Sequence, residues 1–163
     1  MVPLRGDETP NEIIILAYGM EKGLGEFYTA LSRSTDDSEL TSILTKLAGI
    51  EENHRKKLFN LFTNYSDVSD METFESSTVS KMMEGGFTTE EFLKEHGPSL
   101  QTVVDVLNAA MMLETQALDL YLRYSQNTKE EKSRVIFYAI AEDEKAHLAA
   151  LGKLMEKTYE EGD

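Results

Sequence analysis

The sequence contains no cysteine, and this absence removes several kinds of chemistry at once. Without thiols the chain can form no disulfide, no thiolate metal ligand, no iron–sulfur centre and no cysteine nucleophile. Tryptophan is also absent, and only 3 prolines and 10 glycines interrupt the 163 residues. Few helix breakers, combined with many Leu, Glu, Lys, Ala and Met residues, favour helix over strand.

The chain also lacks an excess of basic charge and any long apolar run. It has 30 Asp and Glu against 16 Lys and Arg, which gives a net charge of −14. A nucleic-acid binder presents a basic patch, so we expect no nucleic-acid partner. No segment approaches the roughly 18 apolar residues of a membrane helix, and the start, MVPLRGDETP, has no apolar stretch of signal-peptide length. We expect a cytoplasmic protein without a membrane partner.

Four long segments have helical periodicity, and capping signals mark most of their starts. Thr9, Pro10 and Glu12 form a capping box with proline at the first helical position. Asp36 with Glu39 opens the second segment, Pro98–Ser99 the third, and Thr128 with Glu131 the fourth. The predicted helices span about 10–34, 37–64, 99–127 and 129–160.

The lengths of the connections predict how these helices are joined. The first and third connections are very short, so each should close an antiparallel hairpin. The segment 65–98 is long and polar, with one short helix at about 89–96, and it can carry the chain from one end of a bundle to the other. The sequence therefore predicts a single all-α domain over 1–163, a four-helix bundle of two antiparallel hairpins joined by a long crossover.

The apolar stripe of each predicted helix is interrupted at one level by Glu, or by Glu followed by His. Solvated charges would lie opposite an apolar stripe rather than inside it. In each half the two glutamates are 30 residues apart, and the second belongs to a Glu-x-x-His motif, so the halves look like copies of one hairpin. The interrupting residues are Glu21, Glu51, His54, Glu114, Glu144 and His147.

These six residues are candidate metal ligands. No Lys or Arg occupies the matching stripe positions, and clustered buried carboxylates without compensation cost several kcal/mol each. Residues at i and i+3 share a helix face, so Glu-x-x-His presents a carboxylate and an imidazole to one point. The set suits two divalent ions, and its oxygen and nitrogen donors favour iron or manganese, with zinc also possible.

Two single glutamates with two Glu-x-x-His motifs are the signature of di-iron and di-manganese sites in ferritin-like bundles. The stretches MEKGLGEFY, LAGIEENHRKKL, MLETQALDLY and IAEDEKAHLAAL, with MEGGF between them, resemble a rubrerythrin-type member of the ferritin-like superfamily. The resemblance implies two iron ions bound by the six residues. It also implies reaction with hydrogen peroxide or dioxygen, of peroxidase or ferroxidase type, and a homodimer.

The chain departs from the rubrerythrin pattern at two points. It has no four-cysteine rubredoxin domain, so electrons would come from a separate donor such as a rubredoxin. Ala117 stands where rubrerythrins carry an additional glutamate one turn after the third helix's ligand. A non-catalytic metal-binding or iron-handling module is the alternative, and a protein with a purely structural metal is a third.

Tyr28 and Tyr121 lie seven residues after Glu21 and Glu114 on the same stripes. Each is either a hydrogen-bond partner of a ligand or a core tyrosine.

Overall fold

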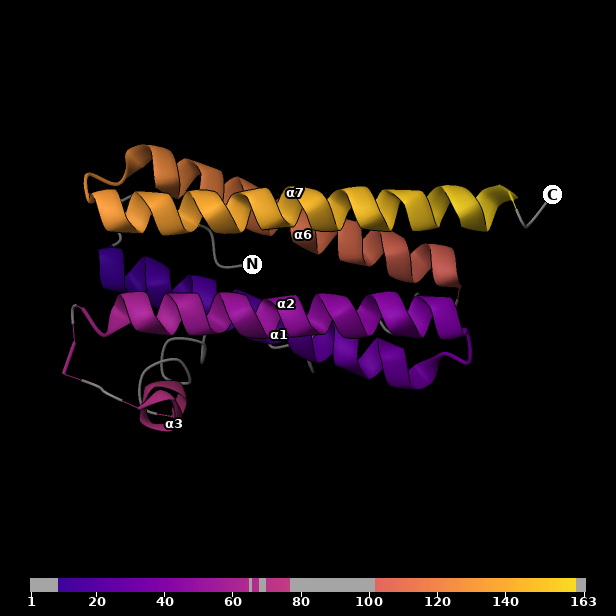
Figure 1. The fold of residues 1–163 in the computed structure, drawn as a ribbon, viewed down its shortest axis with the longest axis horizontal. Helices are drawn as coiled ribbons and strands as arrows, with labels where there is room; N and C mark the ends of the chain where they lie inside the picture. Colours follow the sequence, from indigo (N-terminus) through magenta and orange to yellow (C-terminus); the bar gives the residue numbers. More distant parts are fainter. Residues whose placement is uncertain (1–8, 65, 68–69, 77–101, 161–163) are drawn as a thin grey trace. The chain divides into compact units, whose positions relative to one another are not determined.

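The computed structural model describes residues 9–64, 66–67, 70–76 and 102–160, and within these ranges it contains four long helices, one short helix and no strand (Figure 1). The chain divides into two compact units, Met1–Glu91 and Phe92–Asp163, and each is built on one helical hairpin. The predicted all-α class with paired helices is confirmed. No helix in the described ranges combines the length and apolarity needed to cross a membrane.

The first unit is built on α1 (Pro10–Ser34) and α2 (Ser38–Phe62), which pack along each other. Only residues 35–37 connect them, and the two helices run antiparallel (Figure 1). The predicted capping box is present: the Thr9 hydroxyl accepts from the Glu12 amide, and the Thr9 amide donates to the Glu12 carboxylate at 2.7 Å. This reciprocal pair fixes the start of α1.

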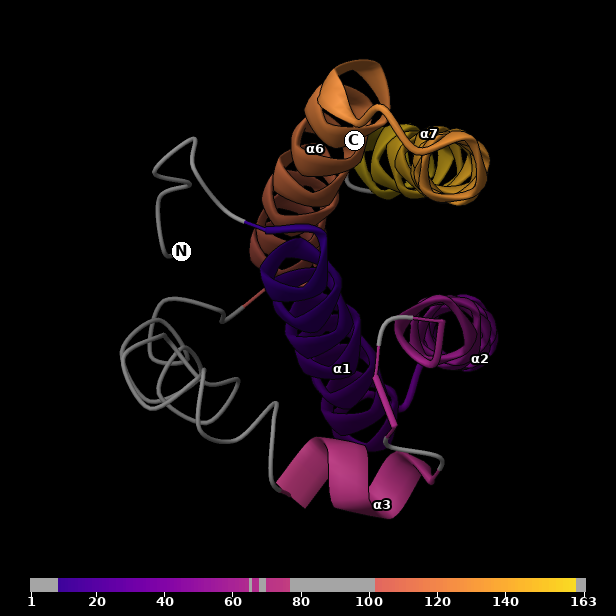
Figure 2. The same ribbon diagram turned by 90° about the vertical axis from the view of Figure 1, so that its left-hand side faces the viewer.

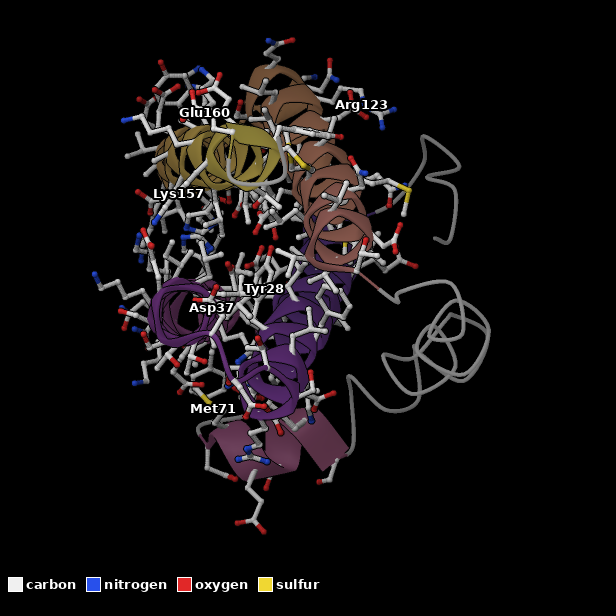
Figure 3. The ribbon with its side chains drawn as sticks, turned by 90° about the vertical axis from the view of Figure 1, so that its right-hand side faces the viewer. Tyr28, Asp37, Met71, Arg123, Lys157 and Glu160 are labelled. Atoms are coloured by element: carbon white, nitrogen blue, oxygen red, sulfur yellow. The ribbon has the colours of Figure 1, made fainter. Side chains whose placement is uncertain are left out.

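The start of α2 differs by one residue from the prediction. Asp37, not Asp36, is the N-cap, and its carboxylate accepts from the amides of Glu39 and Leu40, each at 2.9 Å. Two adjacent aspartates offer the same chemistry, and the short connection selects the second. Figure 3 labels Asp37 at this turn. The helix ends at Phe62, two residues before the predicted end.

A short helix, α3 (Met71–Phe74), lies across α1 and α2 (Figure 2). Asp70 caps it by accepting from the Thr73 amide at 2.7 Å, and this hydrogen bond lowers the pKa of the Asp70 carboxyl. Phe74 is fully buried. The sequence prediction treated this stretch as part of an irregular crossover. The short helix predicted at about 89–96 lies outside the described residues.

The second unit is built on α6 (Val103–Asn127) and α7 (Glu131–Glu160), again joined by three residues. Thr102 caps α6 through a capping box with Asp105, so the described helix starts four residues after the predicted one. The start of α7 also differs from the prediction: Thr128 is the C-cap of α6, and α7 begins at Glu131. Both hairpins thus have the same plan of two long helices and a three-residue turn.

The apolar stripes predicted from the sequence form the buried side of each hairpin. On α1 they include Ile14, Ala17 and Leu24, and the same pattern continues on the other helices. At one level of every stripe the buried side chain is charged or polar rather than apolar. These positions are Glu21 and Glu114 on the first helix of each hairpin, and Glu51, His54, Glu144 and His147 on the second.

Candidate metal centre

All six candidate ligands are buried. Five have no exposed surface, and His147 is 3% exposed. Charged side chains are almost never fully buried unless they are paired or hold a metal. The folded chain therefore buries these six residues inside the apolar stripes, as the periodicity predicted.

In the first unit, α1 and α2 bring three donors together. The Nδ1 atom of His54 lies 3.0 Å from Glu21 Oε2 and 3.1 Å from Glu51 Oε2. Glu51 reaches the imidazole from one turn earlier on the same helix, whereas Glu21 reaches it from the facing helix. Each of the three residues offers a ligand atom within 4.8 Å of the others. Two carboxylates and one imidazole thus point at a single spot.

Gly25 of α1 lies at the contact with α2, next to Glu51. A Cβ atom added to Gly25 would lie 3.5 Å from Glu51 Cβ and 3.9 Å from the Ala48 carbonyl oxygen. These are ordinary van der Waals distances, so an alanine would also fit at position 25, beside the candidate ligand Glu51.

The second unit repeats the arrangement. His147 Nδ1 lies 3.4 Å from Glu114 Oε2 and 3.3 Å from Glu144 Oε2. As in the first unit, one carboxylate comes from the facing helix 33 residues earlier and the other from i−3 on the same helix. The internal repeat inferred from 30-residue spacings therefore corresponds to a repeated three-dimensional cluster.

The distances suit a metal ion. With metal–ligand bonds of about 2.1 Å, neighbouring ligand atoms lie about 3.0 Å apart around an octahedral ion and about 3.4 Å apart around a tetrahedral one. The four Nδ1-to-oxygen distances run from 3.0 to 3.4 Å. A single Nδ1–H could not serve two carboxylate oxygens at full strength, whereas a cation within reach of all three donors can. Each hairpin therefore carries a buried carboxylate–histidine cluster able to bind metal.

The two tyrosines singled out in the sequence are fully buried. Tyr28 contacts Phe27, with ring centroids 5.8 Å apart, and Tyr121 stacks on Phe137 at 5.9 Å. These contacts are those of core aromatic residues. A hydrogen bond from either hydroxyl to a ligand stays a prediction.

A polar cluster beside the first site was not predicted from the sequence. Glu75, directly after α3, accepts a hydrogen bond from the Tyr18 hydroxyl at 2.5 Å and one from Lys22 Nζ at 3.1 Å. Arg55 Nη1 lies 3.4 Å from the same carboxylate. We call Tyr18, Lys22, Arg55 and Glu75 the Glu75 cluster. The other three members are 20 to 57 residues from Glu75 in the sequence, so no local spacing predicts the cluster.

Comparisons with known proteins find one family and one solved structure that this chain is similar to. Residues 105–163 match the family model for rubrerythrin. A hypothetical protein from Pyrococcus furiosus has the same fold, with a TM-score of 0.67 and 20% sequence identity over 93% of this chain and 91% of that chain. No curated protein matches the sequence.

The fold and the buried clusters define the class as ferritin-like. The rubrerythrin match agrees with the resemblance predicted from the sequence motifs, and it covers most of the second hairpin, with two of the candidate ligands on α7 and one on α6. With no cysteine, these 163 residues hold no rubredoxin domain.

Proposed function

We propose that the six residues of the two clusters bind two iron ions, which react with hydrogen peroxide or dioxygen. The observation that carries the proposal is the repeated buried cluster, in which a histidine Nδ1 faces one carboxylate from its own helix and one from the facing helix. Four carboxylates balance the charge of two divalent cations. The match to rubrerythrin supports iron rather than manganese or zinc.

The roles of the residues follow from their chemistry. Glu21, Glu51 and His54 would be the iron ligands of the first hairpin, and Glu114, Glu144 and His147 those of the second. To bind, each imidazole presents a deprotonated Nδ1 and keeps its proton on Nε2, and each carboxylate is ionised. Burial keeps bulk water away from these donors. Bound iron supplies the redox chemistry, a one-electron change per ion between the ferrous and ferric states.

The alternative is a non-catalytic metal-binding or iron-handling module. Ala117, fully buried one turn after Glu114, favours it, because the position offers no additional carboxylate. Turnover also needs a separate electron donor, such as a rubredoxin, since this chain has no electron-carrying cysteine centre. A cytoplasmic location and a homodimer complete the proposal, and the homodimer rests on the family resemblance.

Metal content and rapid mixing test the proposal. Protein purified without chelators, or loaded anaerobically with Fe(II), should bind about two iron ions per chain. Mixing the ferrous protein with hydrogen peroxide, and separately with oxygen, should give a fast absorbance change from iron oxidation. Glu144→Gln should lose this change, and the exposed neighbour Glu142→Gln should keep it.

The outcomes of these measurements distinguish the catalytic function from the non-catalytic alternative. Iron that binds but oxidises no faster than iron in buffer would establish the non-catalytic alternative. A chain that cannot be loaded with any divalent metal would overturn both readings.

A further inference from the structure

We propose that Tyr18 is a redox-active tyrosine, which gives one electron to the oxidant at the proposed iron site and passes its phenolic proton to Glu75. The inference rests on the proposed function, because it takes the oxidant to be hydrogen peroxide reacting at that site. It adds an organic one-electron donor to the carboxylates, imidazoles and iron of the proposed site.

The phenol and the carboxylate are placed for proton transfer. Tyr18 is fully buried, and its hydroxyl donates to Glu75 Oε1 at 2.5 Å, which lies in the range of strong charge-assisted O–H···O hydrogen bonds. A neutral phenol is hard to oxidise while it keeps its proton. An acceptor already hydrogen-bonded to the hydroxyl lets the proton leave together with the electron.

The neighbouring charges keep the two partners in the required protonation states. Burial raises the pKa of Glu75, but hydrogen bonds from Tyr18 and Lys22 and the charges of Lys22 and Arg55 outweigh it and hold that pKa below its usual value. Burial, followed by the bond to Glu75, raises the pKa of Tyr18 well above its usual value. The resting pair is therefore a neutral phenol and a carboxylate.

The surroundings of Tyr18 suit a protected radical. Its ring makes an edge contact with Phe74 at 4.8 Å, and the Arg55 guanidinium lies 6.0 Å from the ring centroid. Phe74 in turn packs against Phe59 at 5.5 Å and Phe62 at 4.5 Å. This aromatic cover shields the phenol ring from solvent. Glu75 remains partly exposed, with 27% of its side-chain surface accessible.

Tyr18 is also close in space to a proposed ligand. It lies one helical turn before Glu21 on α1, which places their Cβ atoms about 5–6 Å apart. The second hairpin has no matching tyrosine: 93 residues on, the distance from Glu21 to Glu114, Tyr18 is replaced by Met111 and Lys22 by Thr115. The tyrosine is thus a feature of the first hairpin alone and no part of the repeat.

The proposed step balances. Hydrogen peroxide takes two electrons and two protons to become two waters. One electron would come from a ferrous ion held by the candidate ligands, which would become ferric, and the other from Tyr18. The Tyr18 O–H bond breaks and its proton forms a new O–H bond on Glu75, while both protons that the peroxide takes up come from solvent. A one-electron reductant then restores the phenol, and Glu75 returns the proton.

The first experiment oxidises Tyr18 without iron chemistry. The protein carries Tyr138→Phe and Tyr159→Phe, which remove two exposed tyrosines, and is loaded with redox-inert Zn(II). A flash-generated ruthenium tris-bipyridine oxidant should produce a persistent tyrosyl radical in electron paramagnetic resonance spectra. Tyr18→Phe should lose this signal. Glu75→Gln keeps a hydrogen-bond acceptor but takes no proton, and should slow the oxidation and change its solvent deuterium isotope effect.

The second experiment mixes the Fe(II)-loaded protein with hydrogen peroxide and follows iron oxidation by absorbance and the radical by resonance. A radical that is lost in Tyr18→Phe, with iron still oxidised, supports the inference. Iron oxidation without a Tyr18-dependent radical overturns the inference and leaves the proposed function standing. Iron that does not oxidise overturns both, and the zinc experiment then shows separately whether Tyr18 and Glu75 form a redox pair. A radical unaffected by Glu75→Gln in both experiments rules out Glu75 as the proton acceptor.

Discussion

Replacing one buried glutamate should change stability in opposite directions in the presence and absence of metal. In the second hairpin, Glu114, Glu144 and His147 each offer a ligand atom within 4.8 Å of the others. Two unit negative charges at that separation repel by about 3.5 kcal/mol at an effective dielectric constant of about 20. Without a cation, the folded protein must either tolerate this repulsion or bind a proton on one of the two carboxylates.

Glu144→Gln removes one of the two charges and keeps the shape of the side chain. We expect the chelator-treated variant to be more stable than the parent by about 1–3 kcal/mol, because proton uptake already relieves part of the repulsion. With metal bound, the same substitution should instead destabilise the protein. Loss of a ligand should weaken binding at least about 100-fold, which removes about 2.7 kcal/mol of stabilisation at saturating metal.

Urea unfolding followed by circular dichroism, with chelator and with excess Mn(II), measures both values. Glu142→Gln is the matched control on the same helix, since Glu142 is exposed and pairs with Lys145 at 2.5 Å. A surface pair of this kind contributes at most about 1 kcal/mol, with no dependence on metal. If Glu144→Gln destabilised the protein equally in both conditions, the carboxylate would be a structural partner of His147, and the reasoning would be refuted.

Other changes test the remaining contacts. Phe74→Ala should lower the free energy of unfolding by about 3–5 kcal/mol or release α3 from the hairpin, which hydrogen exchange at Met71–Phe74 would detect. Because the pKa of Glu75 is lowered in the folded chain, its contribution is present above its usual pKa and is lost as pH falls through the lowered value. Acid should therefore loosen α3 in hydrogen exchange, and Glu75→Gln should remove that pH dependence. Gly152→Ala should raise the free energy of unfolding by about 0.5–1 kcal/mol, seen as a higher melting temperature, because an added Cβ meets nothing within 4 Å and alanine favours helix. Thr9→Ala should cost about 1 kcal/mol by removing the N-cap of α1, seen in the same melts.

The helices and the positions of the candidate ligands were predictable because they depend on local patterns. Apolar residues at steps of three and four define one face of a helix, and Glu51 with His54 repeats the spacing of Glu144 with His147. The cap at Thr9 was predictable for the same reason, since a capping box spans only four residues. These signals identify residues whose neighbours in space are also neighbours along the helix.

Contacts between distant segments could not be predicted. Phe74 and Glu75 sit in a polar stretch, and nothing in their immediate sequence indicates that they pack on Tyr18, 56 or 57 residues earlier. The start of α2 shows a smaller failure of the same kind. Asp36 and Asp37 are chemically equal as caps, and the turn geometry chooses between them. The polar cluster beside the first site therefore emerges only from the folded chain.

The layout of the first unit also bears on protein synthesis. Glu21, Glu51 and His54, with the short helix that packs across α1 and α2, all lie between residues 10 and 75. Helical hairpins have short-range contacts and form fast, and chains emerge from the ribosome N-terminus first. The residues of the first three-donor cluster therefore leave the ribosome before those of α6 and α7. The order of translation then gives the first hairpin the earlier opportunity to capture an ion.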